Sequence, residues 1–512
     1  MSSQNDPRPN RVPTRHFSRR AFLGATLAGS AAAVAAPIAG RQRLAAAQTG
    51  PATPPPGGDT DDLFAEFDAF VARRMAELKV PGVAVGLIAG DRDHTAAFGV
   101  TNVDHPLPID TDTLFQIGST TKTFTATTIM RLIEQEKLDL ETPVRAYLPD
   151  FRVADLDVSA EVRLRHLVTH TAGWYDDALS QETGDGDDAL ARYVDGMADL
   201  PQVTPLGEFF SYNNGAVCLA GRVIEAVTGQ TYEAAVTELV LKPLGMERAT
   251  FFPEQMMTEA FAVGHGAPPD DPAGAPVVRA PWALPRFVNP AGGLVASLRD
   301  ELRYAHFHLG DGTVSGTRVL SPEGLRRMRT PLGPGGTVPQ LVVDNVGVNW
   351  QLQRRGGVTI VSHPGGTNGQ QSNLCLVPAR GFAVTVLTNA DAGAILDIEA
   401  TDWALERFLG LPRPTTTPVP LPPARLAEYA GEYDLPENGG TIRIREEDGT
   451  LRLAELLPGQ TVPAVDSPLR FVGDDLATFD FVGLSVYTDF VRDGAGKVVW
   501  IRFVGRMVPR AT

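Results

Sequence analysis

The feature that most restricts the fold of this chain is a proline-rich segment near its C-terminal end. Residues 411–423 read Leu-Pro-Arg-Pro-Thr-Thr-Thr-Pro-Val-Pro-Leu-Pro-Pro, and segments of this composition are extended, semi-rigid spacers. The chain has 512 residues, which is enough for two or three domains. We therefore predict a large domain over residues 61–410 and a small domain over residues 424–512, joined by this linker.

Residues 424–512 have the pattern of a small all-β domain. Apolar and polar residues alternate in Thr441-Ile-Arg-Ile-Arg and again in Leu451-Arg-Leu, and Asp448-Gly449 between them is a hairpin signal. Further short strands are predicted near 468–472, 477–482, 486–491 and 498–504.

The first 47 residues have the features of an export signal. Ser18-Arg19-Arg20-Ala-Phe-Leu leads into a mildly apolar Ala/Gly-rich run to Gly40, and Ala45-Ala-Ala47 offers a cleavage site of small residues. This pattern resembles a twin-arginine signal. We expect residues 1–47 to direct export to the periplasm or the extracellular space, with no stable membrane insertion after processing. An uncleaved N-terminal anchor is the alternative. Residues 48–60 are rich in Pro, Gly and Thr and are predicted to form a flexible linker.

Charge and cysteine content limit the classes of partner. The formal net charge of −16 becomes −22 when residues 1–47, with seven Arg and one Asp, are removed. A chain this acidic is poorly suited to binding nucleic acid. Cys218 and Cys375 lie in apolar runs, so we expect buried thiols, while a disulfide between them stays open. No cofactor is predicted.

Two long segments are predicted to be loops. Residues 175–205 are acidic around Gly184-Asp-Gly-Asp-Asp188, but the other ligands of a calcium loop are missing, so no metal site is predicted. Residues 264–290 are rich in Pro and Gly and are expected to form a rim or lid.

The large domain opens with a helix and a hairpin. Apolar residues over 61–78 follow helical spacing. Residues 82–89 and 94–100 are short apolar runs on either side of Gly90-Asp-Arg-Asp93, which is a hairpin signal. The sheet of this domain is therefore predicted to begin with an antiparallel hairpin.

The first chemical motif lies in Phe115-Gln-Ile-Gly-Ser119-Thr-Thr-Lys122. A helix that begins near Ser119 and continues through 126–136 places Ser119 and Lys122 on one face. A nucleophilic hydroxyl needs a base within hydrogen-bond reach, and a poorly solvated lysine can lose its proton. The chain has only five lysines among 45 basic residues, and arginine cannot replace a lysine that must lose a proton. A capped helix with a surface lysine is the alternative.

Two further motifs carry chemistry. Tyr212-Asn-Asn214 offers a phenol for proton relay and a carboxamide for a substrate amide. His363-Pro-Gly365-Gly366 ends a β-rich run, and its glycines let a substrate backbone lie close along a strand edge. The structural alternatives are a turn with an ordinary tyrosine and a histidine that caps a strand before a glycine turn.

The three motifs, in this order and widely separated, resemble those of the serine β-lactamase-related hydrolases. The Tyr-x-Asn form is similar to the branch that contains class C β-lactamases, D-alanyl-D-alanine carboxypeptidases, D-aminopeptidases and related esterases. The resemblance covers about residues 62–410. It includes three flanking stretches, Leu167–Gly173, Lys242–Met246 and Pro290–Ser297.

The resemblance implies a role for each motif residue. Ser119 would be acylated, Lys122 and Tyr212 would share the proton transfers, and Asn214 would hold the substrate amide. The backbone N–H groups of Ser119 and Gly366 would form the oxyanion hole.

The third motif implies a restriction on substrate. His363 would replace the lysine of many relatives, and Gly365 would line the substrate. Pro364 stands where relatives that bind β-lactams or C-terminal carboxylates commonly have threonine, whose hydroxyl can donate to the carboxylate. Proline donates nothing, so esters or amides are expected in preference to β-lactams.

The resemblance also implies the fold. It is a β-lactamase/transpeptidase-like α/β (α+β) domain, with an antiparallel sheet from the N-terminal hairpin and the strands after residue 345, flanked by helices, plus a helical lobe that carries Ser119. The small C-terminal domain resembles the lipocalin-like modules of some of these hydrolases and D-aminopeptidases.

The expected function is an exported serine hydrolase that acts through an acyl-enzyme on small esters or amides or on short peptides. The alternatives are a class C-like β-lactamase or D-alanyl-D-alanine carboxypeptidase, a penicillin-binding sensor without turnover, and an idle protein that uses the pocket only for binding.

Overall fold

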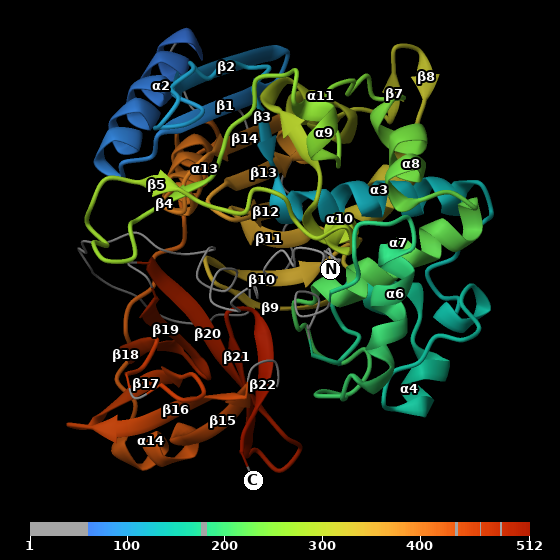
Figure 1. Ribbon diagram of the computed structural model, residues 1–512. Coiled ribbons are helices and arrows are strands. Elements are labelled where there is room, and N and C mark those ends of the chain that lie inside the picture. The colour runs from blue at the N-terminus through green and yellow to red at the C-terminus, as the bar shows by residue number, and fades with distance from the viewer. Residues whose placement is uncertain (1–59, 176–181, 436–438, 461, 482–483, 512) are drawn as a thin grey trace, which may run out of the picture.

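The computed structural model contains two large antiparallel sheets, one in each predicted domain (Figure 1). It describes residues 60–511 apart from 176–181, 436–438, 461 and 482–483. The sheet of the first domain has eight strands, in the spatial order β2 (Arg92–Gly99), β1 (Gly82–Ala89), β14 (Phe382–Thr388), β13 (Gln371–Val377), β12 (Val358–Gly366), β11 (Gln351–Arg355), β10 (Leu341–Val346) and β9 (Gly333–Val338). Since β1 pairs with β14 in the register Val83 to Thr388, the two ends of the domain meet inside the sheet.

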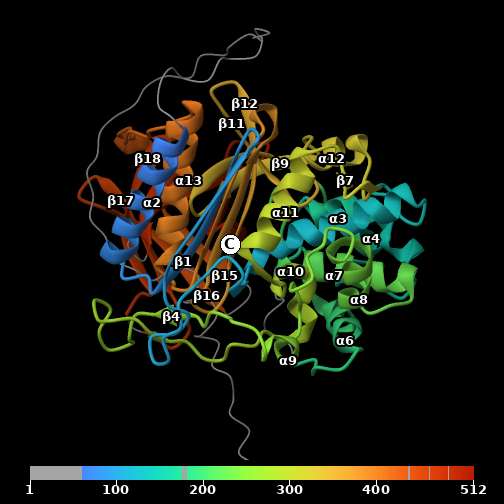
Figure 2. The same ribbon diagram turned by 90° about the horizontal axis from the view of Figure 1, so that it is seen from above.

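Helices cover both faces of this sheet (Figure 2). On one face α2 (Thr60–Glu77) lies beside α13 (Gly393–Leu409), and the ring centroids of Phe67 and Trp403 are 5.5 Å apart. On the other face α11 (Leu298–Leu309) packs against β1 and β14. A strand covered on both faces is apolar throughout, which explains why β1 reads Gly-Val-Ala-Val-Gly-Leu-Ile-Ala without alternation.

A helical lobe lies beyond α11, with α3 (Thr121–Glu134) at its centre (Figure 2). Eleven of the 14 residues of α3 are buried, so the helix is enclosed on all sides. Its threonine hydroxyls bond within the helix and to neighbouring segments: Thr127 Oγ1 donates to Thr123 O at 2.9 Å and lies 2.8 Å from the Tyr304 hydroxyl, and Thr125 Oγ1 donates to Pro290 O at 2.7 Å. The other helices of the lobe are α4 (Leu156–Glu161), α5 (Leu164–Val168), α6 (Ala189–Asp195), α7 (Asn214–Thr228), α8 (Tyr232–Val236), α10 (Asn289–Gly292) and α12 (Pro322–Met328).

The C-terminal domain is a helix, α14 (Pro423–Tyr429), followed by a meander whose strands pair in sequence order. A bridge between Tyr433 and Arg510 joins the first strand to the residue after the last strand, so the meander closes on itself into a small barrel. The strands are β15 (Gly431–Leu435), β16 (Gly440–Glu447), β17 (Thr450–Leu456), β18 (Val465–Gly473), β19 (Leu476–Phe481), β20 (Leu484–Arg492), β21 (Val498–Phe503) and β22 (Arg506–Pro509). The predicted fold class, including the all-β C-terminal domain, is confirmed.

The two domains are in direct contact and are not merely tethered by the linker (Figure 1). Along β9 and β20, Tyr487 N donates to Pro339 O at 2.9 Å. Closer to the helical lobe, Trp500 Nε1 donates to Val203 O at 3.2 Å. The proline-rich segment therefore separates the two cores without holding the domains apart.

Two predictions of local structure are wrong. The predicted loop over 175–205 contains α6, whose apolar residues are buried in the lobe although the surrounding segment is acidic. Residues 176–181 lie outside the described part. The later strands of the sheet, predicted to follow residue 345, begin earlier, with β9 and β10. Strand β9 starts with Gly333-Pro-Gly-Gly, whose residues have low strand propensity, so the pattern did not predict it. The Ser119 helix begins near the predicted residue, since η1 (Gly118–Thr120) leads directly into α3 (Thr121–Glu134). The predicted signal and nearly all of linker 48–60 also lie outside the described residues.

Cys218 and Cys375 are buried, as expected, and no disulfide joins them.

Within residues 60–511, leaving out the undescribed gaps, no helix is long and apolar enough to span a membrane. In the same part of the chain, no group of three or more His, Cys, Asp or Glu side chains is placed to hold a metal ion.

Glu301, on α11, makes the stability of the fold depend on pH. Its side chain is fully buried, and this burial, together with the neighbouring Asp300, raises its pKa to about 8 from an ordinary value of 4.5. The folded protein therefore keeps a proton that the unfolded chain releases. The corresponding stability is fully present below pH 4.5 and is lost as the pH rises toward 8.

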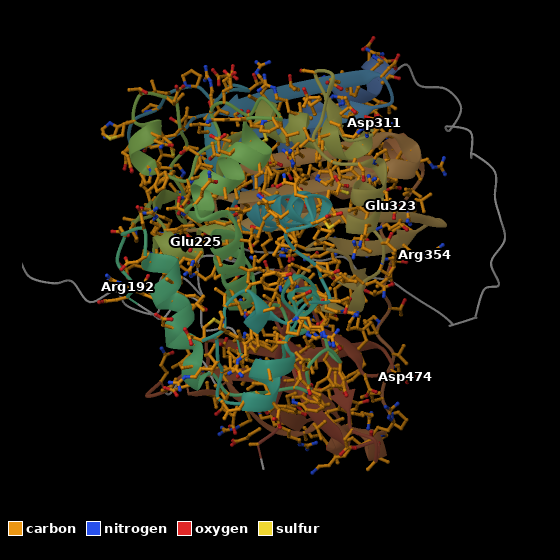
Figure 3. All side chains as sticks on the ribbon, turned by 90° about the vertical axis from the view of Figure 1, so that its right-hand side faces the viewer. Arg192, Glu225, Asp311, Glu323, Arg354 and Asp474 are labelled. Atoms are coloured by element: carbon orange, nitrogen blue, oxygen red, sulfur yellow. The ribbon has the colours of Figure 1, made fainter. Side chains whose placement is uncertain are left out.

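We expect Glu301→Gln to stabilise the protein more at pH 8 than at pH 5, because the amide is neutral at both values. The gain in free energy of unfolding should grow by up to about 1.4 kcal/mol per pH unit between these values. Thermal unfolding followed by circular dichroism at each pH measures this gain. Glu323→Gln is the control, since Glu323 is an exposed carboxylate on α12 (Figure 3). A gain for Glu301→Gln that is the same at both pH values would contradict the prediction.

Candidate active site

A short turn, η1 (Gly118–Thr120), carries Ser119 and leads directly into α3. Thr120 Oγ1 donates to His363 O at 3.1 Å and so ties this turn to β12. Gly118 has a φ of +49°, and a Cβ there would lie 2.5 Å from Gly366 N. Only glycine allows this approach, which places Ser119 beside the end of β12.

Lys122 lies in the first turn of α3 and is completely buried. Its Nζ donates to Ser119 Oγ at 3.0 Å, to Asn214 Oδ1 at 2.7 Å and to Ala291 O at 2.6 Å. Three acceptors for three N–H groups is the arrangement that a buried ammonium requires. In its neutral form, Lys122 would present a lone pair to the Ser119 hydroxyl across the same contact, as a base must.

Tyr212 and Asn214 reach the site from the start of α7. Asn213 caps this helix, since its side chain accepts from Ala216 N at 2.6 Å, and the backbone turns from extended to helical between Tyr212 and Asn214. The ring centroid of Tyr212 lies 4.9 Å from Lys122 Nζ, and Asn214 Oδ1 accepts from the same Nζ. The second predicted motif therefore contacts the first.

His363 brings β12 to the same place. Its ring is 1% exposed, and its centroid lies 6.2 Å from that of Tyr212. Nδ1 donates to Pro364 O at 2.7 Å, which leaves Nε2 as the acceptor, with no partner among the described residues. Burial, reinforced by the charge of Lys122, lowers the pKa of His363 to about 3, so the imidazole is neutral near pH 7.

The glycines of β12 run against the serine turn. A Cβ on Gly365 would lie 1.9 Å from Ile117 O and 2.9 Å from Ser119 N, so no side chain fits there. The ladder between β11 and β12 ends at the pair Gln351–Ser362, so β11 does not cover the following residues of β12. Two backbone N–H groups that could bind an oxyanion, those of Ser119 and Gly366, belong to this contact between turn and strand.

All the residues predicted for the site lie together in this one region, on η1, α3, the start of α7 and β12. They are Ser119, Lys122, Tyr212, Asn214, His363, Gly365 and Gly366. Their roles stay predictions.

Three groups at the site had no predicted role. The ring of His170 stacks on Tyr212 with centroids 4.6 Å apart, Ala291 O accepts from Lys122, and the guanidinium carbon of Arg506 lies 5.6 Å from the Tyr212 centroid. His170 and Ala291 lie in stretches that resemble the family, and this was the only signal for them. Nothing in the sequence pattern could have linked Arg506, in the other domain, to Tyr212.

The chain is similar to several known proteins. The beta-lactamase family matches residues 67–406. Penicillin-binding protein 4 of Amycolatopsis lactamdurans is 33% identical over 373 residues, which cover 72% of this chain and 96% of that protein. Esterase EstB of Burkholderia gladioli is 33% identical over 224 residues, which cover 40% of this chain and 55% of the esterase.

Solved structures extend the likeness into the C-terminal domain. SurE matches 88% of this chain and 100% of its own, with a TM-score of 0.72 and 25% identity. The structure of SurE with D-Leu matches the same shares, with a TM-score of 0.69 and 26% identity. Since the family match extends over most of the chain, this protein belongs to the beta-lactamase family, a family of serine hydrolases.

Proposed function

We propose that the protein is an exported serine hydrolase that acts on small esters or amides or on short peptides through an acyl-enzyme at Ser119. One observation carries this proposal: buried Lys122 has its Nζ 3.0 Å from Ser119 Oγ. A weak nucleophile needs a base at this distance. Tyr212, whose ring centroid lies 4.9 Å from Lys122 Nζ, would share the proton transfers.

In the proposed acylation, Ser119 Oγ bonds to the substrate carbonyl carbon while its proton passes to Lys122 or Tyr212. The oxyanion of the tetrahedral intermediate accepts from the N–H groups of Ser119 and Gly366. The bond to the leaving group then breaks, and the leaving group takes the proton. Water attacks the resulting ester in the same way and releases the acid.

The remaining site residues would orient the substrate. Asn214 would donate through its amide nitrogen, since its oxygen already accepts from Lys122. Gly365 would let the substrate lie against the strand, and His363 would present neutral Nε2 beside Tyr212 without adding charge.

A substrate panel tests this proposal. Purified protein is given p-nitrophenyl esters, D- and L-aminoacyl amides and nitrocefin, and the adduct on Ser119 is followed by mass spectrometry. We expect turnover of esters or amides through a transient adduct. A stoichiometric adduct without product would replace the proposal by a penicillin-binding sensor, and failure of every serine-directed probe to label would replace it by a binding protein.

A second candidate function is hydrolysis next to a free carboxylate, as in a D-alanyl-D-alanine carboxypeptidase or a class C-like β-lactamase. The observation in its favour is the guanidinium of Arg506 beside Tyr212. Guanidinium groups bind carboxylates with paired hydrogen bonds. The similar protein SurE has been solved with D-Leu. A free D-amino acid carries such a carboxylate.

Arg506→Gln distinguishes the two candidates. If Arg506 binds a carboxylate, kcat/KM for a D-aminoacyl-D-amino acid should fall roughly tenfold or more, while kcat/KM for its C-terminal amide should change little. Arg425→Gln is the matched control, because its guanidinium carbon lies 5.8 Å from the centroid of Tyr429 in the same domain. An equal loss on both substrates would rule out carboxylate recognition by Arg506.

Export is proposed from residues 1–47. When this segment is fused to a reporter, we expect it to be cleaved, and changing Arg19 and Arg20 together to lysine should lower the exported fraction several-fold. Cell fractionation and the size of the reporter measure both effects. Unchanged export of the double variant would indicate another route.

A further inference from the structure

The four residues Phe210–Asn213 lie before α7 and outside the regular helices and strands, so their position depends on contacts with other segments. His170 makes three of these contacts. Its carbonyl accepts from Ser211 N at 2.8 Å, its Nδ1 accepts from Asn213 N at 3.1 Å, and its ring stacks on Tyr212. Burial, with the nearby charge of Lys122, keeps the pKa of His170 well below its ordinary value, so Nδ1 stays available as an acceptor.

The C-terminal domain holds the same four residues from another direction. In the hairpin β21–β22, Gly505 O accepts from Tyr212 N at 2.9 Å. Met507 N donates to Ser211 Oγ at 3.1 Å. Arg502 Nε donates to Phe210 O at 2.9 Å. Three consecutive residues, with Tyr212 as the last, are thus each bonded to the other domain.

Arg502 is the anchor of this second set of contacts. It is 3% exposed and pairs with Asp489, whose Oδ1 also accepts from Thr337 N at 3.3 Å on β9. One buried guanidinium therefore connects the barrel, the edge of the main sheet and the segment that carries Tyr212. Removing one member of a buried pair leaves the other charge uncompensated, so these contacts are expected to be held firmly.

We propose that His170 and the hairpin β21–β22 form a clamp that sets the position of Tyr212 against Lys122 and Ser119. His170 and Arg502 are positioning residues of this clamp, and the C-terminal domain is a working part of the active site. The inference rests on the proposed role of Tyr212 in proton transfer. A proton relay is sensitive to such positioning, since a displacement of about 1 Å can cost about 10²-fold in rate.

The test uses the full chain with Arg502→Met, which removes the guanidinium and keeps an unbranched apolar side chain. We expect kcat to fall roughly 10- to 100-fold with little change in KM, and the pH profile of kcat to shift. Arg502→Lys should recover part of the loss, because lysine can still pair with Asp489. Arg492→Met is the matched control: its guanidinium bonds to Glu428, Tyr429, Asp475 and Gly496, all in the C-terminal domain, so its loss should leave kcat unchanged.

A second variant covers the case in which Arg502→Met does not fold. His170→Phe keeps a ring to stack on Tyr212 and removes the acceptor for Asn213 N, without touching the contact between domains. It should lower kcat and shift the pH profile in the same way. Folded variants of both residues with wild-type kcat and an unchanged pH profile would overturn the proposal.

A spectroscopic readout separates this inference from the proposed function. If the wild type forms no adduct at Ser119, the proposed function fails, whatever the clamp does. The clamp is then tested by ¹⁹F NMR of protein labelled with 3-fluorotyrosine, with the resonance of Tyr212 assigned by its loss in Tyr212→Phe. A shifted or broadened Tyr212 resonance in Arg502→Met, but not in Arg492→Met, supports the clamp, and an unchanged resonance overturns it.

Discussion

Ser119→Ala should abolish covalent labelling by a fluorophosphonate probe and lower turnover by roughly 10³-fold or more. The reason is that the alanine variant has no nucleophile while the rest of the pocket is unchanged. Lys122→Arg should cost nearly as much, although it keeps the positive charge, because arginine cannot accept the serine proton. Arginine is also too large for a completely buried position whose three acceptors already surround Nζ.

Lys242→Arg is the control for this pair of variants. Lys242 is an exposed lysine that pairs with Glu238, so its replacement should leave labelling and turnover at wild-type values. Labelling is read by gel fluorescence and mass spectrometry, and folding is checked by circular dichroism. Turnover retained by Lys122→Arg would refute the assigned role of the lysine, and labelling retained by Ser119→Ala would refute that of the serine.

Nitrocefin should be hydrolysed at least tenfold less efficiently than the best p-nitrophenyl ester. A charge-assisted hydrogen bond to the carboxylate of a β-lactam contributes roughly 1.5–3 kcal/mol, or about tenfold to more than a hundredfold in binding. Pro364 offers no such bond, and the neutral state of His363 adds no charge nearby. Pro364→Thr should therefore raise kcat/KM for nitrocefin relative to the ester by about tenfold or more.

Threonine suits the position of Pro364, which lies in β12 opposite Asn373, because β-branched residues pack well in strands. Pro468→Thr is the control, since Pro468 lies in β18 opposite Arg452 and far along the chain from the motifs. Both substrates are followed by absorbance with each variant. If the wild type hydrolyses nitrocefin as well as the best ester, another group must bind the carboxylate, and Arg506 is the group placed for it.

The elements that sequence reasoning found are those whose pattern is local. The helix over 61–78 and the hairpin that follows it correspond to α2, β1 and β2, because spacing and turn residues determine them directly. The three motifs could be recognised since each needs particular residue types at fixed spacing. Their meeting place could be predicted only through the resemblance, because their separation along the chain says nothing about distance in space.

The parts that were missed depend on tertiary contacts. Gly333-Pro-Gly-Gly has no strand propensity and becomes β9 because β10 on one side and the barrel on the other complete its surroundings. His170 and Arg502 are ordinary residues by spacing, and each acquires its position at the site from backbone groups of Phe210–Asn213. No pattern within either segment encodes such a contact.

The pairing of β1 with β14 determines when this fold can be completed during synthesis. Val83 finds its partner only once Thr388 has been made, and at about 5–20 residues per second that interval lasts roughly 15–60 s. Throughout this time β1 is an apolar strand without its central neighbour, and such strands are open to pairing with other chains. A chain that stops anywhere before β14 is therefore an aggregation-prone fragment and not a smaller enzyme.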